Sequence, residues 1–216
     1  MDNSLYQIKN LHLKKSKFNL SIKKFDIHRG AVYMFSGKIN SGKSLVLDIL
    51  AKNSKYNGLL QYDGKNLSDY SKKAYMKEVA VISKLPFSFS NGEAYIKKYI
   101  KKYDAIKTNF KNVNNLIKRF GVGDALSKRV CCLPPSQKRV LNLIAAIAAE
   151  PKVILIDDID MYLTLDELKT LKSILNKKSS FHGVTVVATC RYVHNFTRFA
   201  SVNITLDSGR IIRVRS

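Results

Sequence analysis

The amino-acid sequence predicts an α/β fold in which a glycine-rich loop joins a buried strand to a helix. Residues 37–44 read Gly-Lys-Ile-Asn-Ser-Gly-Lys-Ser, which satisfies the phosphate-binding pattern G-x-x-x-x-G-K-S. An apolar, β-prone run at 31–36 ends at this loop, and the run at 45–51 continues from it as a helix. Two further apolar runs, at 153–156 and 184–189, are typical of strands buried on both faces of a parallel sheet.

The predicted loop carries the groups that hold a nucleoside triphosphate. Glycines let the backbone wrap around the phosphates, and the helix that follows presents the positive end of its dipole to them. Lys43 is placed to reach the outer phosphates, and the Ser44 hydroxyl is placed to ligate Mg²⁺. A chance glycine turn is the alternative, but the flanking strand and helix argue against it. The candidate cofactor-binding residues are Gly37, Asn40, Ser41, Gly42, Lys43, Ser44 and Leu45.

The segments around this core alternate like antiparallel strands. Residues 5–35 carry short apolar and polar alternations broken by turns, which predicts a small antiparallel β region. Residues 58–64 are typical of a further strand with a turn, and residues 79–83 of a short buried strand. Residues 202–211 predict a hairpin that closes the fold.

A helical region separates the two halves of the predicted core. Helical spacing runs from about residue 90 to 127, and a further helix follows Pro135. We expect the apolar face of the first helix to pack inward, with docking of a partner as the alternative. This apolar face comprises Tyr95, Ile96, Tyr99, Ile100 and Tyr103. For the chain as a whole we predict one domain over residues 1–216, with a helical subdomain at about 88–135.

Composition narrows the class of protein. The 216 residues are 45% hydrophobic, which suffices for one α/β domain with its own core. We find no apolar run of about 20 residues that would span a membrane, and no secretory signal at the first residues. Three cysteines without C-x-x-C spacing fit a reducing cytosol. The net charge of +22 lies in small lysine groups, which favours a solvated surface over attraction to an anionic membrane or to nucleic acid.

A pair of acidic residues forms the second element of the predicted site. Asp157 and Asp158 follow the buried run at 153–156 directly. A carboxylate at this end of a parallel strand lies beside the phosphate loop, where Asp157 can hold Mg²⁺ through water. Asp158 can orient or deprotonate the attacking water, so we take Asp158 and Lys43 as the candidate catalytic residues. Two exposed acids that open a loop are the alternative interpretation.

With these elements in order, the chain resembles an ABC-type ATPase, the nucleotide-binding subunit class of ABC transporters. Residues 138–140 and 150–158 are similar to the stretch that joins signature loop and acidic strand in that family. The resemblance implies a P-loop NTPase fold with a RecA-like core, an antiparallel β subdomain and a small helical subdomain. It also implies ATP and Mg²⁺ as cofactors, a dimer of ATPase subunits, and an integral membrane, permease-like partner. The implied location is cytoplasmic, peripheral on the inner face of the membrane.

The signature loop departs from the family pattern. The family reads L-S-G-G-Q, and this chain has Leu133-Pro134-Pro135-Ser136-Gln137. In the family this loop reaches across the dimer to the γ-phosphate on the partner. Pro134 lacks the serine hydroxyl and Pro135 lacks an N–H. We therefore expect Leu133 to keep its position, and Ser136 and Gln137 to be the remaining donors.

Other positions that the family uses for hydrolysis are also changed. Asp158 stands where the family has its catalytic glutamate, one methylene longer. The switch histidine aligns with Cys190, whose thiol is a weak donor. The glutamine that senses Mg²⁺ and the membrane partner aligns with Lys84. The aromatic residue that would stack on adenine has one candidate, Phe18.

Three functions follow from this pattern of kept and altered residues. The first is a weakly hydrolysing ATP-binding subunit of a membrane ABC transporter-like complex that couples ATP-driven dimerisation to its partner. The second is an inactive, ATP-dependent clamp on a membrane complex, of the cell-division or lipoprotein-release type. The third, a DNA-associated ABC ATPase, ranks last because only about fifty residues separate Lys84 from the signature loop, too few for a coiled coil, so we expect no nucleic-acid partner.

Overall fold

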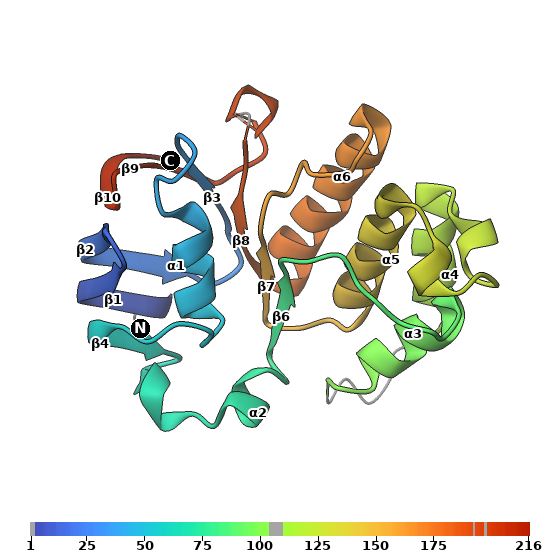
Figure 1. Ribbon diagram of the computed structural model, residues 1–216, viewed down its shortest axis with the longest axis horizontal. Helices are drawn as coiled ribbons and strands as arrows, with labels where there is room; N and C mark the ends of the chain where they lie inside the picture. The colour runs from blue at the N-terminus through green and yellow to red at the C-terminus, as the bar shows by residue number, and fades with distance from the viewer. Residues whose placement is uncertain (1–2, 104–109, 192, 197) are drawn as a thin grey trace.

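The computed structural model describes residues 3–103, 110–191, 193–196 and 198–216. In the described part of the chain the larger sheet has the strand order β10-β9-β3-β8-β7-β6 (Figure 1). Strands β9, β3, β8, β7 and β6 run parallel to their neighbours, and β10 closes the sheet as an antiparallel hairpin with β9. The strands are β3 Val32–Ser36, β6 Val79–Ile82, β7 Val153–Ile156, β8 Thr185–Thr189, β9 Val202–Asp207 and β10 Arg210–Arg215.

The central strands are buried on both faces, as their unbroken apolar runs predict. In β3, Val32 and Met34 join the core that the sheet shares with the helical layer, while Tyr33 and Phe35 join the core on the other face. Parallel strands end at the same edge of a sheet, so β3, β7 and β8 deliver their carboxyl ends to one place. This edge brings together segments that are far apart in the sequence.

The second sheet is antiparallel, with the strand order β2-β1-β4-β5. The alternation predicted between residues 5 and 35 is confirmed, but its short runs form two long strands, which absorb irregular positions as register shifts. Helix α1 packs in the core between this sheet and the larger one. These elements are β1 Ser4–Lys15, β2 Phe18–His28, α1 Lys43–Leu50, β4 Asn57–Tyr62, β5 Lys65–Asn66, the 3-10 turn η1 Leu67–Asp69 and α2 Lys72–Tyr75.

A helical layer covers the other face of the larger sheet and extends beyond it, on the right in Figure 1. Tyr95, Tyr99 and Tyr103 pack partly buried against this core, which confirms the inward packing expected for their helix. The helices are α3 Gly92–Ile100, α4 Phe110–Phe120, α5 Pro135–Ala148 and α6 Leu165–His182, with the 3-10 turns η2 Gly123–Ala125, η3 Val130–Cys132 and η4 Val193–Phe196. Among the described helices, none has the length and apolarity needed to cross a bilayer.

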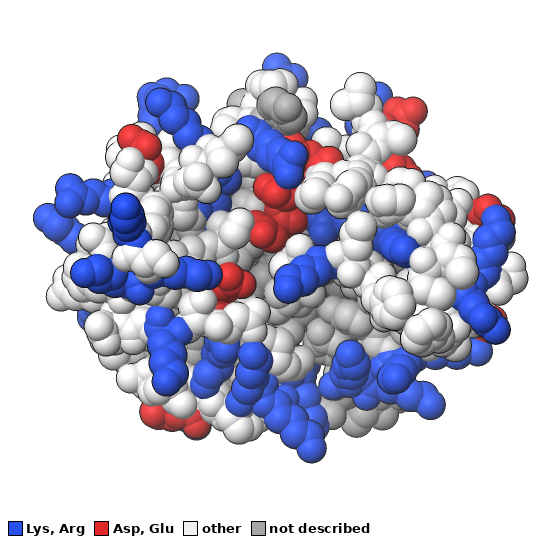
Figure 2. All heavy atoms as spheres, viewed as in Figure 1, with Lys and Arg blue, Asp and Glu red and all other residues white. Residues whose placement is uncertain are grey.

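Charge is unevenly placed on the surface. Figure 2 shows basic side chains spread over one face, with a group of acidic side chains near its centre, where the segment between β7 and α6 lies. Thus a strongly basic molecule keeps a local acidic centre at the carboxyl edge of its main sheet.

Candidate nucleotide-binding site

The backbone of the glycine-rich loop depends on glycine at two positions. Gly37 has φ 145°, and a Cβ there would lie 2.2 Å from the carbonyl oxygen of Leu206. Gly42 has φ 104° and is the residue from which α1 begins. A Cβ at Gly42 would lie 3.0 Å from the ring of Phe18. A side chain at Gly37 would therefore clash with the backbone, whereas at Gly42 the positive φ is the main obstacle and the Phe18 ring would have to shift slightly. The backbone of the loop forms a cradle at the N-terminus of α1.

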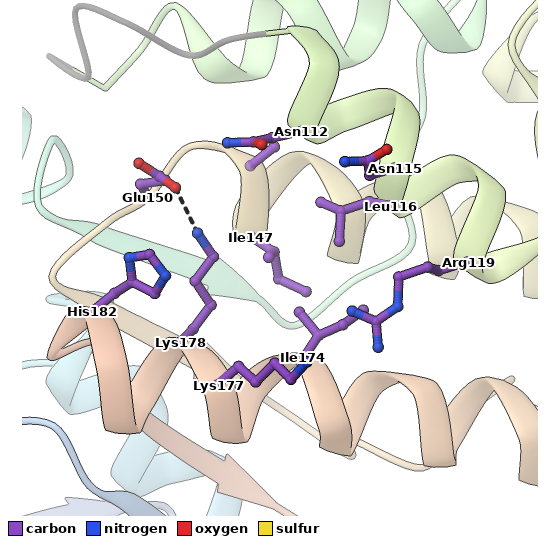
Figure 3. Close-up of a pocket in the computed structure, with 11 residues that line it drawn as sticks. Asn112, Asn115, Leu116, Arg119, Ile147, Glu150, Ile174, Lys177, Lys178 and His182 are labelled. Carbon is purple, nitrogen blue, oxygen red and sulfur yellow. Dashed lines mark hydrogen bonds and ion pairs between the residues drawn. The ribbon is translucent and has the colours of Figure 1, made fainter.

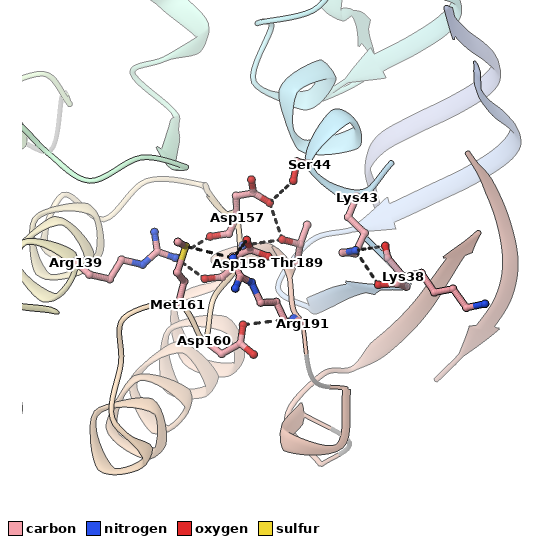
Figure 4. A network of polar contacts seen from close by, with 11 residues as sticks. Lys38, Lys43, Ser44, Arg139, Asp157, Asp158, Asp160, Met161, Thr189 and Arg191 are labelled. Carbon is pink, nitrogen blue, oxygen red and sulfur yellow. Dashed lines mark hydrogen bonds and ion pairs between the residues drawn. The ribbon is translucent and has the colours of Figure 1, made fainter. Parts of the chain in front are cut away.

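Lys43 lies over this cradle. Its Nζ donates to the carbonyl oxygens of Gly37 (2.8 Å) and Lys38 (2.9 Å; Figure 4) and to the Ser41 hydroxyl (3.3 Å). These three acceptors hold the ammonium above the loop, close to where phosphates bind in such a loop. A phosphate oxygen bears more negative charge than a carbonyl oxygen, so it can replace them as the acceptor.

Ser44 and Asp157, the two candidate metal ligands, are brought together by the sheet. The Ser44 hydroxyl donates to Asp157 Oδ1 at 3.0 Å (Figure 4). The same carboxylate oxygen accepts a hydrogen bond of 2.7 Å from the hydroxyl of Thr189, at the end of β8. Mg²⁺ is usually held by one or two carboxylates together with phosphate oxygens. A hydroxyl and a carboxylate that converge beside a phosphate cradle fit MgATP, in which the phosphates supply further ligands. Among the described residues, no group of three or more His, Cys, Asp or Glu side chains could hold a metal ion.

The turn after β7 is fixed by a buried arginine that the sequence did not single out. Asp158 has φ 45°, an uncommon conformation outside glycine. The Arg139 side chain is only 3% exposed and donates to the carbonyl oxygens of Asp157 (2.8 Å) and Asp158 (2.9 Å). Burial lowers the pKa of Arg139, although the neighbouring aspartates oppose this effect. Arg139 lies on α5, so this helix ties the acidic turn to the signature segment at its start.

The residue after β8 is closed off from solvent. Cys190 is 0% exposed, and burial raises the pKa of its thiol to about 12. Its backbone N–H donates to the carbonyl oxygen of Phe35 at 3.1 Å. The next residue, Arg191, instead points to the acidic turn: its Nη2 lies 3.4 Å from Asp158 Oδ2, and its N–H donates to Asp160 Oδ1 at 3.4 Å (Figure 4). The sequence analysis gave no site role to Thr189, Arg139 or Arg191, because their contacts with the acidic turn depend on the tertiary fold.

The signature segment lies at the start of α5. Leu133 is buried, while Ser136 and Gln137 are half-buried in the first turn of that helix. Pro135 occupies the first helical position, where no N–H is needed within the helix. In the described part of the chain no hydrogen bond or ion pair joins this segment to residues 37–44, so the phosphate loop and the signature segment are not in polar contact within one chain.

Lys84 follows β6 and is exposed. Its carbonyl oxygen accepts a hydrogen bond of 3.2 Å from the amide of Asn142 on α5, and the Asn142 oxygen accepts from the Tyr95 hydroxyl at 3.0 Å. Asn142 is only 6% exposed. This buried amide therefore connects the Lys84 loop to helices α3 and α5.

Two cavities differ in their relation to the site. One of about 230 Å³ borders the phosphate loop, and Phe18 forms part of its wall, as a base-stacking residue would. Another of about 260 Å³ lies between α4, α5 and α6, and no predicted site residue lines it (Figure 3). The cavity that borders the phosphate loop is lined by Lys15, Phe18, Asn40, Gly42, Ser44, Leu45 and Asp48.

Known proteins share both the sequence pattern and the fold. The family model described as ABC transporter matches residues 20–160. A putative ABC transporter ATP-binding protein of Bacillus cereus is 24% identical over 194 residues, covering 86% of this chain and 35% of the relative. The methionine import ATP-binding protein MetN of Campylobacter jejuni is 22% identical over 212 residues, covering 87% of this chain and 63% of the relative. The chain spans about a third of the length of most of these curated relatives.

Solved structures give the same architecture at low identity. The ATP-binding subunit of an ABC transporter superposes with a TM-score of 0.90 at 18% identity, covering 99% of this chain and 90% of that one. The structure of cbiO1 from Clostridium perfringens, part of the ABC transporter complex cbiONQ, gives a TM-score of 0.79 at 20% identity, covering 99% of this chain and 88% of that one. The match of the family model over most of the chain shows the family: this chain belongs to the ABC transporter family and has the fold of its ABC-type ATPases.

Proposed function

We propose that this chain is the ATP-binding subunit of a membrane ABC transporter-like complex. The observation that carries the proposal is the convergence of Lys43, Ser44 and Asp157 at the carboxyl edge of the sheet. Relatives with the same family match are named as ABC transporter ATP-binding proteins. Binding and release of ATP would couple to an integral membrane, permease-like partner, with the subunit peripheral on the cytoplasmic, inner face of the membrane.

Each residue of the site has a role in holding ATP. Lys43 exchanges its carbonyl acceptors for the outer phosphate oxygens. Ser44 and Asp157 hold Mg²⁺, which neutralises charge on the phosphates. Phe18 covers the base beside the loop. Asp158 orients the attacking water or accepts its proton.

We propose that hydrolysis is slow. Asp158 is one methylene shorter than the glutamate that the family has at this position, and the thiol of Cys190 is buried in the core. Loss of a well-placed proton acceptor costs about 10²–10⁴-fold in rate, and loss of one donor to the transition state about 10²–10³-fold. These losses do not multiply, because groups that act as a unit are not additive. A clamp that binds ATP without turnover is the second candidate, favoured by the same changes at positions 158 and 190.

The site is completed by a second ATPase subunit. Within one chain the signature segment and the phosphate loop are not joined, so the signature segment serves the site of another subunit. A structural relative is a dimeric cassette in a post-hydrolysis state bound to ADP and Pi, with a TM-score of 0.82. Both a homodimer and a heterodimer satisfy this arrangement.

The docking surface for the membrane partner is placed on the Lys84 loop and the helical subdomain. Phe87 and Phe89, which follow Lys84, are 72% and 74% exposed, and their rings lie 5.2 Å apart. A groove of about 620 Å³ lies between α2 with the turn after it and the end of α3, and lysines and tyrosines form most of its lining. The partner segment that fits this surface is acidic with apolar side chains. The groove residues are Lys73, Met76, Lys77, Val81, Tyr99, Lys101, Lys102 and Tyr103.

A crosslinking experiment tests this assignment. A photoreactive residue replaces Lys84, Tyr95 or Lys98 in cells, with replacement of Lys177 on α6 as the matched control. We expect membrane-protein adducts at the three test positions and none at the control. Adducts with soluble proteins or nucleic acid alone would contradict the membrane assignment, and nucleic-acid adducts would favour the DNA-associated alternative. Phosphate release with the captured partner present separates the slow ATPase from the inactive clamp.

A further inference from the structure

We propose that Arg191 is a catalytic residue of this chain, whose guanidinium contacts the terminal phosphate of bound ATP and holds the Asp158 carboxylate beside it. The inference rests on the proposed function as an ATP-binding subunit. It assigns the hydrogen-bond donor that Cys190 does not supply at the switch position to the next residue in the sequence.

The topology brings Arg191 to the right place. Strand β8 lies between β3 and β7 in the sheet. The phosphate loop follows β3, and the acidic turn follows β7. Arg191 leaves the end of β8 and therefore emerges between the two, on the same edge as Lys43 and Asp157 (Figure 4).

The contacts of Arg191 orient its side chain over the acidic turn. Nη2 lies 3.4 Å from Asp158 Oδ2 and 3.9 Å from the sulfur of Met161, and the backbone N–H donates to Asp160 Oδ1. The side chain of Arg191 is 55% exposed, whereas that of Asp158 is 27% exposed. The guanidinium thus sits at the open side of the site, with donors left over for a ligand.

The chemistry favours a phosphate as that ligand. A guanidinium keeps its charge at any physiological pH and presents a planar fork of donors that matches phosphate oxygens. The ion pair between Arg191 and Asp158 is long and its arginine is exposed, so it contributes little to the stability of the fold. The guanidinium can therefore move to bind a phosphate, which carries more negative charge, with little loss of stability. Cys190 cannot take this role, because its thiol is fully buried.

The test compares Arg191→Gln and Arg191→Lys with a matched control, Arg119→Gln on α4. Arg119 also donates through Nη2 at 3.4 Å, to Ser173, but lies far from the loop in the fold, beside the cavity of Figure 3. Calorimetry measures the affinity for MgATP and MgADP, and a single-turnover assay measures phosphate release. Thermal unfolding checks that each variant is folded, and Arg191→Lys keeps the test informative where Arg191→Gln is not folded.

Contact with the terminal phosphate predicts a selective loss. Arg191→Gln lowers the MgATP affinity about tenfold and leaves the MgADP affinity within about twofold, since only ATP carries that phosphate. Phosphate release falls by about 10–100-fold, with Arg191→Lys in between and Arg119→Gln unchanged. An equal change for both nucleotides, or no change, overturns the inference and leaves the proposed function standing. A wild type that binds neither nucleotide overturns both.

Discussion

Replacement of Thr189 by valine removes a hydroxyl that links the two aspartates of the site. Thr189 is 0% exposed; its hydroxyl donates to Asp157 Oδ1 and accepts from the Asp158 N–H, both at 2.7 Å. Valine has nearly the same shape, so packing is kept and only the hydrogen bonds are lost. The lost bond to a charged carboxylate costs about 1.5–3 kcal/mol, and the N–H left without a partner about 1–3 kcal/mol.

These costs overlap, because both aspartates can relax once the bridge is gone, so we expect a total of about 2–4 kcal/mol. For a domain of this size each kcal/mol lowers Tm by about 2–4 °C, so Thr189→Val should melt about 5–15 °C below the wild type. Thr189→Ser keeps the hydroxyl and loses one buried methyl group, which costs about 1 kcal/mol.

Thermal unfolding followed by circular dichroism, on the wild type and both variants without added nucleotide, provides the measurement. The predicted order of Tm is wild type, then Thr189→Ser, then Thr189→Val. A valine variant that melts at or above the serine variant would refute the reasoning, because packing and not the hydroxyl bridge would then fix the turn.

Three further substitutions follow from the same geometry. Gly37→Ala should abolish MgATP binding, because its Cβ would meet a backbone carbonyl oxygen. The control Gly121→Ala, where φ is 68° and the space is open, should keep ATP binding and lower the free energy of unfolding by only about 1–2 kcal/mol. Equal ATP affinity of the two variants would contradict this prediction. Cys190→His should lower the free energy of unfolding by about 1–3 kcal/mol without raising ATP turnover, because the larger ring does not fit the buried position. The native thiol, whose pKa burial raises to about 12, should react slowly with a thiol reagent at about pH 8. Labelling of Cys190 as fast as of exposed Cys132 would contradict its burial. Asn142→Ala should lower the free energy of unfolding, measured with urea, by about 1–3 kcal/mol, because the Tyr95 hydroxyl and the Lys84 carbonyl each lose a hydrogen-bond partner. An unchanged midpoint of urea unfolding would refute the connection between α3, α5 and the Lys84 loop.

Local patterns predict the elements of this fold well. The glycine loop at 37–44, the acidic pair after a buried strand and the helix after Pro135 each depend on neighbouring residues, and the structure has them all. The N-terminal strands show the limit of this reasoning. The predicted runs at 6–8 and 11–13 are separated by Lys9 and Asn10, but in the structure β1 continues through these residues with a register shift against β4.

The site itself depends on contacts that no local pattern contains. Arg139 reaches the carbonyls of the acidic turn from a helix nearly twenty residues away, and Thr189 reaches Asp157 across 32 residues. Both contacts depend on the order of the strands in the sheet and on the position of α5 next to the acidic turn. Neither of these can be predicted from composition or periodicity. Alignment by motif alone likewise gave Cys190 the switch position, while burial separates its thiol from the neighbouring Arg191, which reaches Asp158.

The central claim is that the loop at 37–44 binds MgATP, and Lys43 tests it most directly. Calorimetry should show MgATP binding to the wild type and at least about tenfold weaker binding to Lys43→Ala, because a charged partner of the phosphates is lost. Lys98→Ala, which removes the same charge from the exposed face of α3, should bind as the wild type does. Equal MgATP affinity of wild type and Lys43→Ala would contradict the account.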